Sequence, residues 1–272
     1  MEPLLSERLR SMVRTFYREH ADSFSDSRAS PWPGWRRLLD EADRRLAENP
    51  TVRALDVGCG NGRFIRALAD RLKTHARRLE IIGLEPSDEL LSIARRRLAD
   101  LAEVEGLQLD LLAGELPVTA PSAQAASVER SAGGPPETQG TALGTFDLIA
   151  LLAVLHHVPG MAARHALMRR LGDHLTPNGI LAVSIWRFDR DPAFLRRRVP
   201  WTSLEPVVAT DQLEANDHLL SWQGDRSALR YCHLVDDAET DALIKASGLR
   251  LLSCWEADGA SGRSNAYLLL GQ

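Results

Sequence analysis

The chain has 272 residues, of which 44% are hydrophobic and 26% charged, so it can bury the core of a globular protein. Its formal net charge of −4 excludes a uniformly basic nucleic-acid binder, so any contact with RNA must come from a local patch. The cysteines Cys59, Cys232 and Cys254 form no Cys-x-x-Cys pair, which argues against a disulfide framework and against a zinc site.

No apolar run approaches the roughly 20 residues that span a membrane. The stretch from Met1 to Arg18 is interrupted by charges throughout, unlike the apolar core of a signal peptide. We therefore expect a cytoplasmic protein with no membrane contact and no metal ligands.

The first 50 residues are expected to form a helical lid. Apolar residues recur at helical spacing over residues 4–20 and again over residues 35–48. The segment Phe24–Pro33 between them contains two prolines and several small polar residues, which predict that it is not helical.

A buried strand, a glycine turn and a helix are predicted in succession over residues 53–64. Three glycines alternate at Gly58, Gly60 and Gly62, which allows positive φ angles and close approach of a ligand to the main chain. The pattern differs from the dinucleotide-binding Gly-x-Gly-x-x-Gly, because its third glycine comes one position early and Arg63 stands in that place.

An acidic residue, Asp56, precedes this loop. The resulting Asp-Val-Gly-Cys-Gly-x-Gly pattern resembles motif I of the class I methyltransferases that use S-adenosylmethionine (SAM). In that family the loop cradles the amino-acid end of SAM. The resemblance therefore implies that SAM is the cofactor and that Asp56, Gly58, Cys59, Gly60 and Gly62 contact it.

The second strand is predicted at Leu79–Glu85, which is nearly continuous in apolar residues, as a buried parallel strand should be. A carboxylate at its end, Glu85, can accept hydrogen bonds from both ribose hydroxyls, with Pro86 in the same turn. Ser87 is a suitable N-cap for a helix over residues 88–102.

A short third strand is predicted at Leu107–Asp110. In this fold an acid after the third strand meets the adenine amino group, and both Asp110 and Glu115 qualify. We favour Asp110, with Leu111 beside it. Residues 118–145 are dominated by Ala, Ser, Pro, Gly and Thr, and are interpreted as a flexible low-complexity insertion.

The fourth strand, Phe146–Leu152, runs into Ala153 and the pair His156 and His157. Ligands of open parallel sheets bind outside the carboxyl ends of the strands. This rule predicts that Leu152 and Ala153 contact the cofactor and that the histidines lie near its methyl group. A structural role for the histidine pair at the start of the next helix is equally consistent with the sequence.

The remaining elements complete a Rossmann-like α/β fold, with a seven-stranded, mostly parallel sheet and one antiparallel strand. They are a helix over residues 163–175, a turn over 176–179, strands over 180–186, 249–256 and 264–270, and a helix over 237–247. Residues 187–235 interrupt this order with arginines and interleaved aromatics, and are expected to form a substrate cap within a single domain. The arginines at 196–198 either contact the phosphates of a nucleic-acid backbone or form a solvated helix face.

Several segments outside the SAM motifs resemble the tRNA wobble-uridine carboxymethyl methyltransferases. This family includes the yeast-type enzyme and the methyltransferase domain of a human AlkB homologue. The matching residues are Phe24, Ser27-Arg28, Pro31-Trp32-Pro33, Asp56–Gly62, Ala153–His157, Trp186, Val199-Pro200-Trp201, Arg230–His233 and Asn265. The chain departs from the family at Val158, at Ala266 and in its short basic loop, and these departures bear on the substrate more than on the reaction.

The resemblance implies methyl esterification of a carboxymethyl group on uridine. A carboxylate is already ionised at neutral pH, so the reaction needs alignment and desolvation rather than a strong base. Arg28, or as a second choice Arg230, would bind the carboxylate bidentately, and His157 or His156 would donate a hydrogen bond to the substrate. Arg28 is also explained as a residue that only ties the lid to the domain.

Further substrate contacts are expected from side chains of the same motifs. These are Trp32, His156, Trp186, Trp201, Tyr231 and His233. Trp32 and Trp201 are also explained as packing anchors. The expected partner is tRNA or a small-molecule carboxylate, since the fold does not fix the substrate.

A third interpretation is a SAM-binding subunit without activity, against which the intact loop argues. By resemblance, a small zinc-binding activator protein is a further expected partner. The apolar edge near the third strand, Leu107, Leu109, Leu111 and Leu112, would be its docking place.

Overall fold

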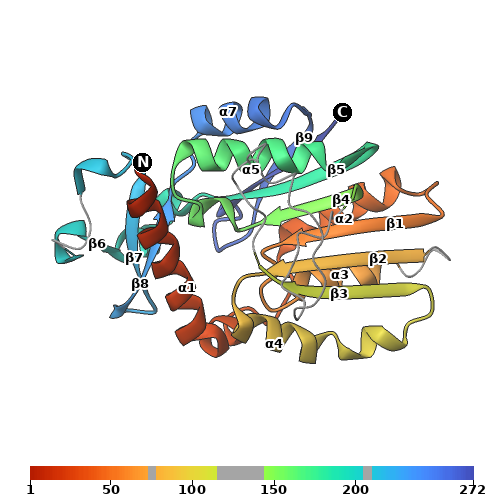
Figure 1. Cartoon of the computed structure of the whole chain (residues 1–272), viewed down its shortest axis with the longest axis horizontal. Helices are drawn as coiled ribbons and strands as arrows, with labels where there is room; N and C mark the ends of the chain where they lie inside the picture. Colours follow the sequence, from red (N-terminus) through yellow and green to blue (C-terminus); the bar gives the residue numbers. More distant parts are fainter. Residues whose placement is uncertain (73–77, 115–143, 205–209) are drawn as a thin grey trace, which may run out of the picture.

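The computed structural model describes residues 1–72, 78–114, 144–204 and 210–272 (Figure 1). A seven-stranded sheet with the order β3-β2-β1-β4-β5-β10-β9 lies at its centre. The strands are β1 (Thr51–Val57), β2 (Arg78–Glu85), β3 (Leu107–Ala113), β4 (Phe146–Leu152), β5 (Leu175–Trp186), β9 (Arg250–Ala257) and β10 (Asn265–Gly271). Only β10 runs antiparallel to its neighbours, which confirms the predicted class I sheet.

Helices cover both faces of this sheet. On one face, α2 (Pro33–Arg45) and α3 (Arg63–Leu72) pack side chains such as Leu38 and Leu68 against the strands. On the other face, α5 (Met161–Asp173) and α7 (Asp237–Ser247) pack Leu167 and Leu243. Burial on both faces explains the nearly continuous apolar runs of the central parallel strands.

Three predicted boundaries are wrong. The helix predicted over residues 88–102 ends earlier, because α4 (Asp88–Arg97) is followed by a separate 3-10 helix, η1 (Ala99–Glu103). Strand β3 continues three residues beyond Asp110. The turn predicted over residues 176–179 lies within β5, where the extra residues form an irregularity between two pairs of partners.

The N-terminal helix α1 (Pro3–Asp26) is longer than predicted and is kinked at His20, with φ −122° and ψ 18°. Its last turns enter the segment that was expected not to be helical. Tertiary contacts override the weak helix propensity there, because Phe24 packs edge-on against Tyr17 and the buried Ser25 accepts a hydrogen bond from Asn61.

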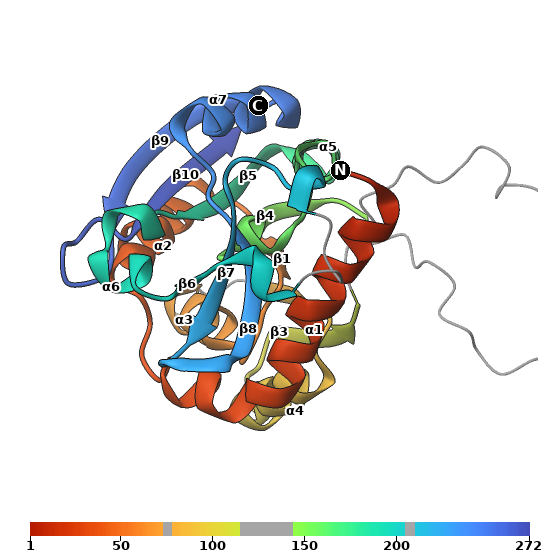
Figure 2. The same ribbon diagram turned by 90° about the vertical axis from the view of Figure 1, so that its left-hand side faces the viewer.

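The expected cap contains a second sheet, which was not predicted from the sequence. Strands β6 (Arg198–Val199), β7 (Asp217–Trp222) and β8 (Asp225–His233) pair antiparallel, after a short helix α6 (Pro192–Leu195). Helix α1 lies along β8 (Figure 2). Leu5 and Leu9 pack against Tyr231 there.

The insertion predicted over residues 118–145 lies almost wholly outside the described residues. Among the described helices, none has the length and apolar character that crossing a membrane requires.

Candidate cofactor and acceptor site

A cavity of about 390 Å³ is lined by residues at and just beyond the carboxyl ends of the parallel strands. These strand ends face α1 and the cap (Figure 1). Most of the predicted site residues line the cavity. They are Arg28, Trp32, Asp56, Gly58, Cys59, Gly60, Glu85, Pro86, Leu152, Ala153, His156, His157, Trp186 and Arg230. Folding therefore brings the SAM motifs and the remote motifs of the lid and cap to one place.

The glycine loop has the left-handed backbone that its sequence predicts. Gly58, Gly60 and Gly62 have φ angles of 73°, 55° and 77°. A Cβ atom on Gly58 would lie 2.6 Å from a methyl carbon of Val154. Gly62 does not line the cavity, contrary to its predicted cofactor contact; a Cβ atom there would lie 2.7 Å from Leu98, so this glycine permits close packing instead.

Glu85 at the end of β2 is held by two main-chain donors. Its carboxylate accepts hydrogen bonds from the amides of Gly60 at 2.8 Å and Ser87 at 2.9 Å. The two bonds fix the orientation of the carboxylate. Because each oxygen has two lone pairs, both oxygens can also accept a hydroxyl of a bound ribose.

Asp56 at the end of β1 is only 3% exposed, and its Oδ2 atom has no hydrogen-bond partner among the residues that the structure describes. Burial, together with the negative charge of Glu85, raises the pKa of Asp56 to about 8. A buried carboxylate oxygen that lines a cavity without a partner suits a cationic ligand group. The α-ammonium group of SAM is such a group, so the residues present fit the amino-acid and ribose parts of this cofactor.

The predicted adenine contacts do not lie in the cavity. Asp110 pairs in register with Ile82, three residues before the end of β3, and its side chain is exposed. Leu111 packs against the sheet core rather than toward the cavity. Gly114, just beyond the strand, does line the cavity, and the alternative Glu115 lies outside the described residues.

Arg230 on β8 enters the other half of the cavity inside an aromatic cage. Its guanidinium lies 5.0 Å from the Trp222 ring, 5.1 Å from Phe16 and 5.4 Å from Trp186. The residue is 2% exposed, and within the described ranges its Nε atom has no hydrogen-bond partner. No carboxylate of the described part of the chain pairs with this buried cation.

Arg28 is a second cation in this half of the cavity. Its guanidinium lies 4.3 Å from the centre of the Phe24 ring and donates a hydrogen bond to Ser27. Burial lowers the pKa of Arg28 to about 10, and the charges of Arg230 and Arg197 act in the same direction. The two arginines thus give this half of the cavity a positive charge that an anionic ligand would neutralise.

Both ring nitrogens of His157 are already occupied. Nδ1 lies 3.0 Å from the carbonyl oxygen of Tyr231, which can only accept, so Nδ1 carries the proton. Nε2 therefore accepts from the hydroxyl of Tyr17 at 2.9 Å. Burial lowers the pKa of His157 to about 3, so the ring is neutral. His157 supports the wall and does not have the free donor that was predicted.

His156 differs from its neighbour, because no described residue forms a hydrogen bond with its buried Nδ1 atom. Burial lowers the pKa of His156 well below its usual value, so it offers a neutral polar group beside Trp186.

Tyr17 also lines the cavity, although it was not among the predicted site residues. The available signal was the spacing of Val13, Tyr17 and Phe24 along one helix face, since all three line the cavity.

Trp201, Tyr231 and His233 lie outside the cavity, contrary to prediction. Successive side chains of a strand point to opposite faces, so Arg230 faces the cavity while Tyr231 and His233 face away. The Tyr231 hydroxyl donates a hydrogen bond to the carboxylate of Asp217 at 2.7 Å. The Trp201 indole donates to the main-chain carbonyl oxygen of Asp217 at 3.2 Å.

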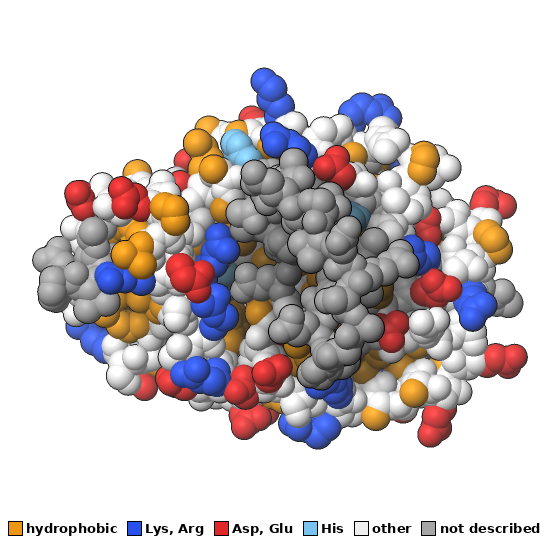
Figure 3. Space-filling model, viewed as in Figure 1, with side chains coloured by type: hydrophobic (Ala, Val, Ile, Leu, Met, Phe, Trp, Pro, Cys, Tyr) orange, Lys and Arg blue, Asp and Glu red, His pale blue; other side chains and the backbone are white. Residues whose placement is uncertain are grey.

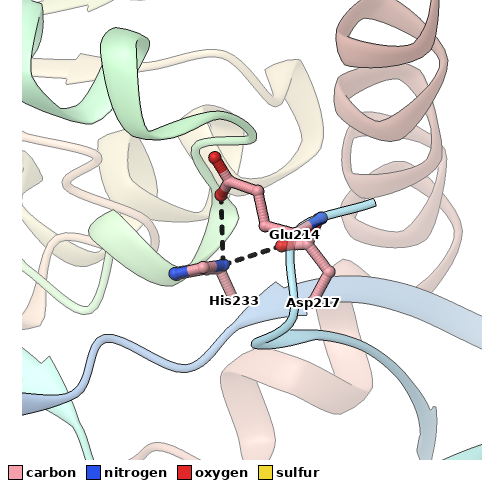
Figure 4. Close-up of side chains that lie close together, drawn as sticks. All are labelled: Glu214, Asp217 and His233. Atoms are coloured by element: carbon pink, nitrogen blue, oxygen red, sulfur yellow. Dashed lines mark hydrogen bonds and ion pairs between the residues drawn. The ribbon is translucent and has the colours of Figure 1, made fainter. Parts of the chain in front are cut away.

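His233 belongs to a buried charged cluster that joins the cap to α5 and α7 (Figure 4). Its ring nitrogens lie 2.7 Å from carboxylate oxygens of Asp217 and Glu239. Arg164 forms ion pairs with Glu239 at 2.6 Å and with Glu214 at 2.8 Å. Because both ring nitrogens face carboxylates, His233 is doubly protonated, and it supplies the positive charge of the cluster together with Arg164.

Replacement of His233 by glutamine is expected to lower the free energy of unfolding by about 3 kcal/mol at pH 6. Burial alone would lower the pKa of His233, but the hydrogen bonds to Asp217 and Glu239 raise it overall. Its contribution is therefore complete below pH 6.5 and is lost as pH rises through the folded pKa. Urea unfolding of both proteins from pH 6 to pH 9 measures this difference.

A matched control is His218→Gln, because His218 lies on the neighbouring strand and its pKa is lowered to about 4, mainly by burial and also by the charges of Arg198 and His233. This variant should lose less than about 1 kcal/mol. An equal loss for His233→Gln at every pH would contradict the assignment of a protonated ring.

Comparison with known proteins supports the interpretation of the cavity. A methyltransferase-domain family model matches residues 55–181. The tRNA (carboxymethyluridine(34)-5-O)-methyltransferase ALKBH8 of Mus musculus is 26% identical over 179 residues, which are 66% of this chain and 20% of that protein. The dTDP-3-amino-3,6-dideoxy-alpha-D-glucopyranose N,N-dimethyltransferase of Streptomyces fradiae is 27% identical over 135 residues, 49% of this chain and 39% of that protein.

Among solved structures, the magnesium protoporphyrin IX methyltransferase ChlM from Synechocystis PCC 6803 with bound SAH has the same fold. Its TM-score is 0.56 at 14% identity, over 96% of this chain and 99% of that chain. The match to this chain therefore covers one fifth of the length of the mouse relative, whereas it covers 99% of the bacterial chain. The family match and the cavity confirm a class I methyltransferase domain with SAM as cofactor.

Proposed function

We propose that this chain, a class I methyltransferase that uses SAM, transfers the methyl group to a carboxylate. The observation that carries the proposal is Arg230, a buried guanidinium in an aromatic cage with no acidic partner among the described residues. A buried cation without a counter-ion is unfavourable unless a ligand anion completes it. Arg28 adds a second donor for the same anion.

The residues of the acceptor half suit this reaction without a general base. SAM, when bound, supplies an electrophilic methyl group on a sulfonium. The arginines would hold one carboxylate oxygen in line with that methyl, and the aromatic walls exclude water. No proton has to leave an ionised carboxylate, which agrees with the neutral and fully hydrogen-bonded His157.

We assign the carboxylate to the carboxymethyl group of a modified wobble uridine in tRNA. The motifs at Arg28–Pro33, Val199–Trp201 and Arg230–His233 support this assignment through their resemblance to that family. The name of the mouse relative, a member of the same family, agrees with it.

A small-molecule carboxylate or hydroxyl compound is the second candidate. On the face shown in Figure 3, basic and acidic side chains are intermixed over α1. Arg14 on this helix, for example, is paired with Glu7. Together with the net charge of −4, this mixed surface favours a small acceptor over a long polyanion.

The test uses purified protein, SAM labelled in its methyl group and bulk tRNA in two portions. One portion is treated with mild alkali, which exposes carboxymethyl groups by hydrolysing their esters, and the other is left untreated. We expect label in the treated portion, and we expect alkali to release it again. Label that resists alkali would contradict a carboxylate acceptor. Transfer only to a small-molecule extract would contradict tRNA as the acceptor.

A zinc-binding activator protein remains part of this proposal by resemblance alone. The edge strand β3 would receive it, because Leu107, Leu109 and Leu111 are only partly buried and Leu112 is 37% exposed. Omission of such a partner from the assay would lower transfer without changing the chemistry.

A further inference from the structure

Arg63 follows the third glycine of the loop and begins α3, and no motif gives it a role. It lines the cavity, yet it is 8% exposed. One guanidinium nitrogen donates to the carbonyl oxygen of Ser30 at 2.6 Å. The guanidinium lies 4.8 Å from the ring of Trp35 and 5.1 Å from that of Trp32. None of the carboxylates in the described residues forms an ion pair with it.

The guanidinium of Arg63 is therefore buried against neutral groups, and the negative charge of Asp258, which also lines the cavity, raises its pKa only as one of the smaller contributions. Burial lowers the pKa of Arg63 to about 10, with a further contribution from the charge of Arg28, so it remains a cation at neutral pH. Leaving a desolvated guanidinium without an anion is unfavourable. The carbonyl of Ser30 satisfies one donor, and the planar fork of arginine keeps others for a bidentate anion.

Arg63 is electrostatically coupled to the other unpartnered group of the same loop. Its positive charge lowers the pKa of Asp56, against the larger effect of burial. Beside the glycine loop, the cavity wall thus presents a carboxylate whose Oδ2 atom has no hydrogen-bond partner, and a guanidinium that forms no ion pair, within the described part of the chain. An α-amino acid carries the complementary pair, an ammonium and a carboxylate on one carbon.

We propose that Arg63 binds the α-carboxylate of SAM while Asp56 binds its α-ammonium. The inference concerns the cofactor and does not depend on the identity of the methyl acceptor. It separates the arginines of the cavity into two groups. Arg63 serves the amino-acid end of SAM, and Arg230 serves the acceptor anion inside its own cage.

The test compares two ligands by calorimetry, S-adenosylhomocysteine (SAH) and its decarboxylated analogue, an aminopropylthio-adenosine. Both ligands carry the ammonium group, so any change in the ionisation of Asp56 affects them equally. We expect the wild type to prefer SAH by roughly 10- to 100-fold, the strength of hydrogen bonds between charged groups. Arg63→Met should abolish this preference while binding of the decarboxylated ligand stays within about threefold.

Two variants make the result decisive. Arg63→Lys keeps the charge but not the fork, and should recover part of the preference for SAH. Arg28→Met is the matched control in the same cavity, and should keep the full preference. The proposal is overturned if Arg63→Met retains the wild-type preference for SAH. If both affinities are also unchanged, another cation binds the carboxylate, and if both fall by the same factor, Arg63 is a structural residue.

Discussion

Replacement of Arg230 by methionine is expected to lower kcat/KM for the acceptor by at least about 100-fold, because two hydrogen bonds from a guanidinium to a carboxylate are lost together. The affinity for SAH should stay within about twofold, since Arg230 lies in the acceptor half of the cavity. Transfer of labelled methyl and calorimetry with SAH measure the two quantities. Arg230→Lys should restore only a small part of the activity, because an ammonium cannot bind a carboxylate bidentately.

Arg230→Met is expected to fold at least as well as the wild type. A buried cation with no acidic partner among the described residues destabilises the folded state. Three cation–π contacts offset this cost only in part. Methionine fits an aromatic cage without that charge. Arg226→Met, an exposed change on the same strand, is the control. Loss of SAH binding by Arg230→Met, or a destabilisation above about 2 kcal/mol, would make Arg230 a structural residue.

The affinity for SAH is expected to rise by roughly 50-fold between pH 6 and pH 8. Burial and the charge of Glu85 raise the pKa of Asp56 to about 8, so the free protein holds this carboxyl protonated at pH 6. An ammonium ligand requires the ionised form, and binding below pH 8 therefore releases a proton. Calorimetry in buffers of different ionisation enthalpy measures both the affinity and the released proton.

Asp56→Asn should bind SAH weakly and show no pH dependence over this range. 5′-Methylthioadenosine, which has no amino-acid group, is the matched ligand for the wild type and should show a flat profile. A flat profile for SAH itself would contradict the raised pKa of Asp56. A persistent slope in Asp56→Asn would assign the titration to another group.

The cofactor half could be predicted from the sequence because its signals are local. A glycine needs positive φ within its own turn, and Glu85 follows its own strand directly. The acceptor half depends on which side of β8 each residue faces. The motif Arg230–His233 was treated as one unit, whereas strand alternation sends Arg230 to the cavity and His233 to a charged cluster.

Other features could not be predicted, because their cause lies far away in the sequence. Helix α1 continues past the expected break because Ser25 meets Asn61 on the glycine loop. Tyr17 becomes a site residue only through His157, which is 140 residues further along the chain. The prediction for Asp110 failed for a different reason, since β3 runs three residues beyond the predicted strand Leu107–Asp110, through the apolar residues 111–113.

The pairing of α1 with the cap also determines the order in which the cavity can form during synthesis. Ser23 and its partner Trp222 are 199 residues apart. At roughly 5–20 residues per second, a ribosome needs about 10–40 s to make the intervening chain. During that interval Leu5, Leu9 and Phe16 have no cap to cover them. The nascent chain thus exposes an apolar stripe that chaperones can recognise, and the acceptor half of the cavity is completed only after the cap has been synthesised.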